Sequence, residues 1–299
     1  MSAPSLRIQC VLFHNDVAAV RRLVESLANA TRIAQSGALL GAVTLALGDS
    51  GSDAPSLAAA DVAGLRELAG EAFAALDHRV FDRNLGHGGG QNALAAGFSE
   101  DYLLVINPDT VAEPLLLARL VERFNDPSVG IAEARQLPSE HPKDYALEGG
   151  LTDWSSMACA MLRGEMVRSV GLFDDETFFM HCDDVDLSWR VRLAGWVISH
   201  QPLARVFHDK RIGVGGYVEP SGSEHVQGPL GHLLLAYKWS RDDEVHALAA
   251  QLRHGTPEQQ QALQLFEDRR DRGQLPAARL DPKGTVAAFT GGTFAVHRF

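Results

Sequence analysis

Short apolar runs alternate with amphipathic segments along the first half of the chain. The apolar runs predict strands at 6–13, 42–47, 78–81 and 102–106. Apolar residues spaced three or four apart predict helices at 17–30, 58–76, 93–98 and 116–124. Because the predicted strands are apolar throughout, we expect a mostly parallel sheet that is covered by helices on both faces.

The second half of the chain carries a different pattern. Residues 132–154 are rich in Pro, Gly and charge and are predicted to form a long loop over a cleft. The elements predicted after it are strands at 156–162 and 196–200, and helices at 185–194, 230–239, 245–252 and 257–271. A glycine-rich stretch at 213–216 separates the last three helices from the rest, so we expect an α/β domain at 1–212 and a mainly helical extension at 213–299.

Polar turns follow the predicted strands. They lie at 14–16, 48–53, 84–92 and 107–110. In open parallel sheets, ligands bind at the carboxyl ends of the strands, and these ends share one edge of the sheet. We therefore expect the turns to converge on one cleft.

Composition narrows the class of protein. The 299 residues, 45% of them hydrophobic, can bury a substantial core. The 27 Lys and Arg against 38 Asp and Glu give a formal charge of −11 without a basic stripe, which excludes nucleic acid as the expected partner.

Cysteine usage and hydropathy indicate the cellular compartment of the protein. Cys10, Cys159 and Cys182 are odd in number and lack metal-ligand spacing, so we expect reduced thiols rather than disulfides or a zinc site. No targeting pattern and no span of membrane length is visible. We expect a cytoplasmic protein, and the composition is equally compatible with peripheral attachment at the inner face of the membrane.

Asn107-Pro108-Asp109 directly follows a predicted buried strand. A carboxylate there can bind a divalent cation that also contacts a diphosphate, because hard cations take oxygen ligands from both. The alternative is a plain turn, since all three residue types favour turns.

Three carboxylates in Asp183-Asp184-Val185-Asp186 begin a predicted helix. One of them can accept a proton from a sugar hydroxyl as a general base. Two alternatives stay open: acidic residues in a first turn also offset the helix dipole, and a carboxylate pair also suits glycoside hydrolysis.

Glycines 86 and 88–90 let the backbone approach a ligand closely, and the helix that follows can offer amide hydrogens to an anion. A glycine-rich turn without a ligand is the alternative. His208 follows an apolar run and can serve as a neutral imidazole ligand, although a lone histidine is more often structural.

Taken in order, these motifs resemble the family 2 glycosyltransferases of the GT-A fold, in particular the bacterial branch of rhamnosyl- and galactofuranosyltransferases. The resemblance runs from about residue 6 to 208. Its most specific part extends from Val170-Gly171-Leu172-Phe173 through Asp183-Asp184 to His208. The fold implied is a Rossmann-like α/β sheet with flanking helices, to which the C-terminal helical annex is added.

The resemblance implies a role for each matching residue. Asp184 would be the general base of an inverting displacement, with Asp183 beside it, and Asp109 and His208 would hold Mg or Mn. The residues that it places at the donor are Phe13, Asn15, Asp49, Asn84, Gly89, Asn92 and Asn107.

Two motifs depart from the family pattern. The usual Glu-Asp pair is Asp183-Asp184 here, which bears on contacts with the acceptor. The nucleoside-binding acid is either Asp49, displaced by one position, or absent.

The function expected is transfer of rhamnose or another hexose from a dTDP- or UDP-sugar to a glycan or lipid-linked acceptor, in cell-surface or secondary glycan synthesis. A catalytically silent nucleotide-sugar-binding protein and a glycoside hydrolase are the alternatives. The amphipathic annex suits either a homodimer surface or an acceptor groove.

Overall fold

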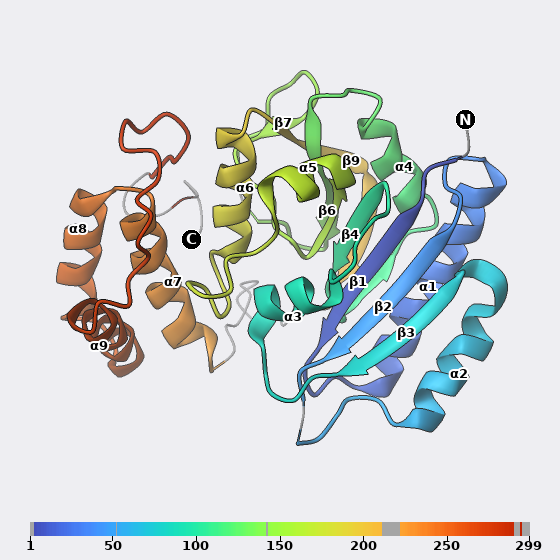
Figure 1. The fold of residues 1–299 in the computed structure, drawn as a ribbon, viewed down its shortest axis with the longest axis horizontal. Helices are drawn as coiled ribbons and strands as arrows, with labels where there is room; N and C mark the ends of the chain where they lie inside the picture. The colour runs from blue at the N-terminus through green and yellow to red at the C-terminus, as the bar shows by residue number, and fades with distance from the viewer. Residues whose placement is uncertain (1–2, 52, 142, 211–221, 290–293, 295–299) are drawn as a thin grey trace.

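The computed structural model describes residues 3–51, 53–141, 143–210, 222–289 and 294. Their strands form one sheet in the order β3-β2-β1-β4-β8-β6-β9-β5, and β7 pairs with β9 (Figure 1). The strands are β1 Leu6–Leu12, β2 Val43–Asp49, β3 Ala75–Val80, β4 Tyr102–Ile106, β5 Thr110–Ala112, β6 Val129–Leu137, β7 Leu151–Thr152, β8 Cys159–Arg163 and β9 Val197–His208. The helices are α1 Val17–Ser36, α2 Ala59–Ala69, the 3₁₀ turn η1 Gly70–Ala72, α3 Gly86–Leu94, α4 Leu116–Arg123, α5 Gly164–Val170, α6 Asp183–Leu193, α7 Glu224–Lys238, α8 Asp242–Leu252 and α9 Pro257–Asp271.

The sheet is parallel in its first half and mixed in its second. β3, β2, β1 and β4 pair in parallel, as the sequence predicts. β8 runs antiparallel to both β4 and β6, whereas β6 and β9 are parallel to each other. The parallel half aligns the carboxyl ends of four strands at one edge, and this edge carries the polar turns.

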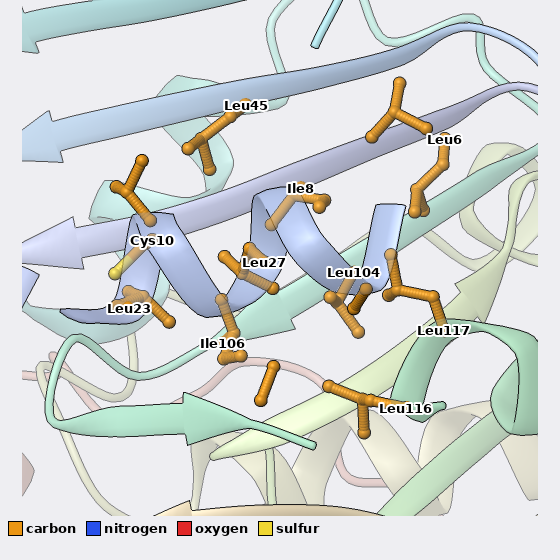
Figure 2. Packing of buried hydrophobic residues seen from close by; sticks show 14 of the residues in the cluster. Leu6, Ile8, Cys10, Leu23, Leu27, Leu45, Leu104, Ile106, Leu116 and Leu117 are labelled. Atoms are coloured by element: carbon orange, nitrogen blue, oxygen red, sulfur yellow. The ribbon is translucent and has the colours of Figure 1, made fainter. Parts of the chain in front are cut away.

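Helices cover both faces of the sheet because its central strands are apolar on both sides. Leu104 and Ile106 of β4 pack in the layer of α1 and α4, whereas Leu103 and Val105 pack in the layer of α5 and α6. Figure 2 shows the first of these layers, where side chains of β1, β2 and β4 meet those of α1 and α4. Fully burying an aliphatic side chain contributes about 2 kcal/mol, so these layers supply much of the stability of the fold.

The prediction of a long loop at 132–154 is wrong in part. The chain continues as β6 to Leu137 and forms β7 at Leu151–Thr152, which leaves 138–150 as the connection. The loop was predicted from the Pro, Gly and charged residues of the segment, and two of the charged residues, Glu133 and Arg135, belong to β6. It is nevertheless a strand because β6 lies between β8 and β9 in the sheet, and the charge of Glu133 is neutralised inside the protein.

The glycine-rich loop is also corrected. The prediction placed a loop at 84–92 and a helix at 93–98, but the glycines themselves form α3 at Gly86–Leu94. Glycine has no side chain, and this permits close packing there: a Cβ on Gly88 would lie 2.8 Å from Phe173, and one on Gly90 would lie 2.8 Å from Val11. Tertiary contact thus overrides the low helix propensity of glycine.

The helical annex is present in the described residues as α7, α8 and α9, which lie beside α6 (Figure 1). It shares one apolar cluster with α6, in which Trp189 of α6 meets Trp239 edge-on at 5.3 Å. The glycines at 213–216 and the expected boundary near 212 lie outside the described residues. Within those residues, no helix has both the length and the hydropathy to cross a membrane.

Candidate active site

The carboxyl ends of the parallel strands meet at one edge of the sheet. Leu12 at the end of β1 is in register with Asp49 at the end of β2, and Asp49 is in register with Val80 of β3. β4 ends beside them at Ile106, directly before Asn107. The polar segments that follow these strands therefore start from the same edge.

Asp109 and His208 lie together although they are far apart in sequence. Thr110 of β5 pairs with His208 of β9, and the N–H of Asp209 donates to the carbonyl of Asp109 at 2.8 Å. His208 Nε2 is 3.2 Å from Asp109 Oδ1. The carboxylate is 43% exposed and the imidazole 10%, so the pair opens toward solvent from the carboxylate side.

Gln136 orients His208 from behind. Its Nε2 donates to Ser156 Oγ at 3.2 Å, and its Oε1 faces His208 Nδ1 at 2.9 Å. Because Gln136 Oε1 is an acceptor, Nδ1 carries a proton, so in the neutral tautomer the lone pair lies on Nε2. This lone pair faces the oxygen of Asp109, which is also an acceptor, so the two atoms are complementary to a cation.

The donor set fits a divalent ion such as Mg or Mn with an open coordination sphere. In the described part of the chain, His, Cys, Asp and Glu side chains do not gather in threes around a metal position. Asp109 and His208 thus offer one oxygen and one nitrogen. The remaining positions suit phosphate oxygens and water, as in other sites that bind a cation with a substrate phosphate.

Asn107 shapes the turn that presents Asp109. Its N–H donates to the carbonyl of Ala158 at 2.9 Å, and its own carbonyl accepts from Thr110 Oγ1 at 2.7 Å. The turn is thereby tied to β8 on one side and closed onto β5 on the other.

Asp49 organises the loop on the nucleoside side of the predicted site. Its carboxylate is fully buried and accepts from the N–H of Gly51 at 3.0 Å and of Ser56 at 2.6 Å. Ser56 Oγ in turn accepts from the N–H of Asn15 at 3.0 Å. Phe13, whose N–H donates to Asn15 Oδ1, leaves half of its side chain exposed at the same edge.

Asn84 and Asn92 make hydrogen bonds within the protein. Asn84 Oδ1 accepts from the N–H of Gly86 at 2.9 Å. Asn92 donates to the carbonyl of Phe173 and to Asp175 Oδ1, both at 2.8 Å, and accepts from the N–H of Phe173 at 3.1 Å. Asn92 therefore joins α3 to the segment that leads into α6.

The start of α3 is packed against that same segment. The N–H of His87 donates to the carbonyl of Phe179 at 3.2 Å. A Cβ on Gly89 would lie 3.2 Å from Asp175 Oδ2. The first two amides of α3, those of Gly86 and His87, thus donate to protein oxygens, and the glycines serve close packing against 173–179.

Asp183 and Asp184 begin α6 after two residues with unusual backbone. His181 and Cys182 both have φ of 64°, a conformation that costs free energy in residues other than glycine and is often found at functional sites. Asp183 is almost fully buried, with Oδ2 2.6 Å from Nδ1 of His87. Asp184 is half-buried in the first turn, where its carbonyl accepts from Ser188 Oγ at 2.7 Å.

The pKa of Asp183 reflects these neighbours. Burial by itself would raise it, but the charge and hydrogen bond of His87 and the charge of His181 outweigh burial, so the pKa is lowered. Asp183 is therefore ionised at neutral pH.

Asp186, the third carboxylate of the motif, has a structural role. It is fully buried and accepts from Arg190 Nε at 2.8 Å and from Trp239 Nε1 at 3.0 Å. Lys238 Nζ lies 2.7 Å from Asp186 and 2.6 Å from Asp174. Asp186 thus ties α6 to α7.

The residues that connect the acid pair to the Asp109–His208 pair were not predicted from the sequence. The N–H of Ser155 donates to Ser188 Oγ at 3.0 Å, and Ser188 donates to the carbonyl of Asp184. The next residue, Ser156, accepts from Gln136, which holds His208. Gln136 was not predicted as a site residue because its segment was predicted to be a loop. No local pattern marks it, since its role depends on the pairing of β6 with β9.

The chain resembles known glycosyltransferases in sequence. It is 36% identical over 83 residues to N-acetylglucosaminyl-diphospho-decaprenol L-rhamnosyltransferase of Mycobacterium tuberculosis (strain H37Rv), a match that covers 28% of this chain and 24% of that relative. The chain thus spans about a quarter of the length of this curated relative. No family model matches the chain.

Solved structures resemble it over most of its length. GalNAc-T7, solved with UDP, GalNAc and Mn²⁺, matches with a TM-score of 0.61 and 12% identity, over 91% of this chain and 55% of that one. The mannosyltransferase PcManGT from Pyrobaculum calidifontis, solved with GDP-Man and Mn²⁺, matches with a TM-score of 0.54 and 13% identity, over 89% and 70%. The resemblance that the motifs predict is confirmed, and the chain has the GT-A fold of glycosyltransferases.

Proposed function

We propose that the protein is a metal-dependent glycosyltransferase that moves a sugar from a nucleoside-diphosphate donor to an acceptor hydroxyl with inversion. The observation that carries the proposal is the pairing of Asp109 with His208 at the strand ends of a GT-A fold. The donor we assign is a dTDP- or UDP-sugar, and the sequence match to a rhamnosyltransferase favours rhamnose or another hexose as the sugar. The acceptor we assign is a glycan or a lipid-linked glycan in cell-surface or secondary glycan synthesis, and the diphospho-decaprenol in the name of that relative supports a lipid-linked one.

The chemistry assigned to the chain is a single displacement. Asp184 accepts the proton of the acceptor hydroxyl, the acceptor oxygen bonds to the anomeric carbon, and the bond from that carbon to the diphosphate oxygen breaks. A Mg or Mn ion held by Asp109 and His208 would supply positive charge beside the leaving diphosphate. One displacement inverts the anomeric centre, and no covalent intermediate on the enzyme is needed.

The donor is assigned to the carboxyl edge of β1, β2 and β4. Phe13 offers an exposed ring there, and Asp49 orders the neighbouring loop through buried hydrogen bonds. The wall on the sugar-diphosphate side is assigned to Asn84, Gly89 and Asn92. These residues shape it through the contacts of α3.

The base assignment predicts separate effects on binding and transfer. In a panel of nucleotide sugars with Mn²⁺, the wild-type protein is expected to bind and turn over at least one donor. Asp184→Asn should keep donor binding within about threefold and lower kcat by about 10²–10⁴, the usual contribution of a general base. Unchanged transfer in this variant would remove Asp184 from the mechanism.

The metal assignment is tested by donor binding in calorimetry. Asp109→Ala should weaken binding of the diphosphate donor strongly in Mn²⁺ and little in EDTA, because the carboxylate acts through the cation. Asp209→Ala, a neighbouring acid whose N–H anchors the turn, is the matched control and should retain the Mn²⁺ effect. An equal loss with and without Mn²⁺ would place Asp109 outside the coordination sphere.

A further inference from the structure

His87 and Asp183 form a short, mostly enclosed pair beside the proposed base. His87 Nδ1 is 2.6 Å from Asp183 Oδ2, with 24% of the imidazole side chain and 5% of the carboxylate side chain exposed. This separation is as short as the shortest hydrogen bonds between charged groups, which are shorter than bonds between neutral ones. The pair joins the first turn of α3 to the first turn of α6. The helix α3 belongs to the wall assigned to the donor, and α6 carries the acid pair.

The surrounding structure holds the imidazole in place. The ring of Phe173 meets the imidazole edge-on at 5.1 Å. Gly88, the next residue, would carry a Cβ 2.8 Å from Phe173 and 3.4 Å from Asp183 Oδ2, so a side chain there would clash with Phe173 and touch Asp183. The glycine therefore permits the close approach of α3 to Phe173, the ring that packs on the imidazole.

We propose that His87 is a positioning residue that holds Asp183 as the anion of an ion pair, so that Asp184 is the carboxylate of this acid pair that takes up the acceptor proton. The inference rests on the proposed transferase function and deepens it. It divides the two adjacent acids into one that is neutralised by His87 and one that acts on substrate.

The charges around the pair support this division. Burial by itself would lower the pKa of His87, but the charge and hydrogen bond of Asp183 and the charge of Asp184 outweigh burial, and the pKa is raised. The charge of His181, in the segment before α6, also acts on Asp183, and Asp175 lies beside Gly89 of α3. With His87 protonated, Asp184 adjoins an ion pair of zero net charge rather than a second bare carboxylate.

Loss of the imidazole should change the proton affinity of the base. In His87→Phe, Asp183 and Asp184 would be two adjacent carboxylates without their cation, and repulsion raises the pKa of one of them. The acid limb of the pH profile of kcat/KM should move to higher pH by about 1. In the double variant His87→Phe/Asp183→Asn, the second carboxylate is absent, so the limb should return close to its wild-type position.

Two results would overturn the inference. One is a His87→Phe variant whose kcat/KM falls by the same factor at every pH, which indicates packing alone. The other is a double variant that keeps the displaced acid limb. Thermal melting of each variant checks that it is folded.

An NMR titration of the imidazole separates this inference from the transferase assignment, because it needs no turnover. The pKa of His87 should exceed the ordinary value of about 6.5 in the wild-type protein and fall by about 1 or more in Asp183→Asn. Equal values in the two proteins would refute the ion pair even if transfer is observed. A raised value without turnover of any donor would leave the pair intact and count against the transferase function.

Discussion

Glu133 places a negative charge in the middle of the sheet, where its side chain has no exposed surface. Lys143 Nζ approaches its two carboxylate oxygens to 2.6 and 2.7 Å, and the N–H of Ser156 donates to it at 2.8 Å. Burial by itself would raise the pKa of Glu133, but Lys143 and His200 outweigh burial, so the pKa is lowered. The ion pair therefore fixes Ser156, which in turn contacts Gln136, the hydrogen-bond partner of His208.

Removing the cation should destabilise the protein in a pH-dependent way. Lys143→Met leaves Glu133 buried without its main partner and is expected to lower the free energy of unfolding by about 3 kcal/mol at pH 7. A lowered folded-state pKa stabilises the protein above the unfolded value of about 4.3, and this stabilisation is lost as pH falls through the folded-state pKa. The effect of the substitution should therefore shrink below about pH 4.

Urea unfolding at pH 7 and at about pH 3, below the unfolded-state pKa of about 4.3, measures this difference. Lys143→Met/Glu133→Gln is the matched control, and it should recover part of the stability at pH 7 because no buried charge remains. A loss for Lys143→Met that is the same at both pH values would contradict the role of the charge.

Among the elements, α3 is a helix rich in glycines because its neighbours pack so closely that they leave no room for side chains at these glycines. Gly86 has φ of 71°, and a Cβ there would overlap the carbonyl oxygen of Phe179. Gly97 has the same φ of 71°, but a Cβ there would meet nothing within 4 Å. A comparison of these two positions therefore separates the cost of backbone strain from the cost of lost packing space.

Alanine at these two positions gives a matched comparison. Gly97→Ala should cost about 1 kcal/mol from its left-handed backbone alone. Gly86→Ala carries the same strain and must also push α3 away from Phe179, which should add about 2 kcal/mol. Chemical denaturation measures both, and equal losses would show that α3 can shift without cost.

At the scale of the whole molecule, the annex supports the helix that carries the proposed base. The apolar cluster of α7, α8 and α9 includes Val185 and Trp189 of α6, and Lys238 of α7 binds Asp174 and Asp186. A Cβ on Gly231 of α7 would lie 2.9 Å from the carbonyl oxygen of His181, so the annex also packs on the strained turn before α6. The annex and the site are therefore expected to unfold together.

Lys238→Met should remove the polar part of this contact. It leaves Asp174 and Asp186 without their shared cation and is expected to destabilise the protein by about 3 kcal/mol. Tryptophan fluorescence and circular dichroism should still report coincident unfolding transitions in urea. The exposed pair of Arg272 with Asp268 gives the control, because Arg272→Met should change stability little. Separate transitions in the wild-type protein would show that the annex is an independent unit.

The strands and helices of the parallel half could be predicted because their hydrophobic periods are local. β1, β2 and β4 were expected within one or two residues of their ends, and α6 and α9 were also expected closely. β6 was missed because Glu133 and Gln136 meet their partners, Lys143 and His208, only in the folded protein, and no local pattern records these contacts. α3 was misplaced for a related reason, since its glycines are helical through contacts with Phe173 and Val11.

For the site, Asp109, His208 and the acid pair were predicted from residue types, their order in the chain and the family resemblance. Three features required the tertiary structure: the 3.2 Å approach of His208 to Asp109, the orientation of His208 by Gln136, and the pairing of Asp183 with His87. Each joins groups from different strands or helices, and their distance and burial depend on how the sheet and helices pack. Local sequence carries the chemical type of each group, whereas packing decides which partner it meets and therefore its charge.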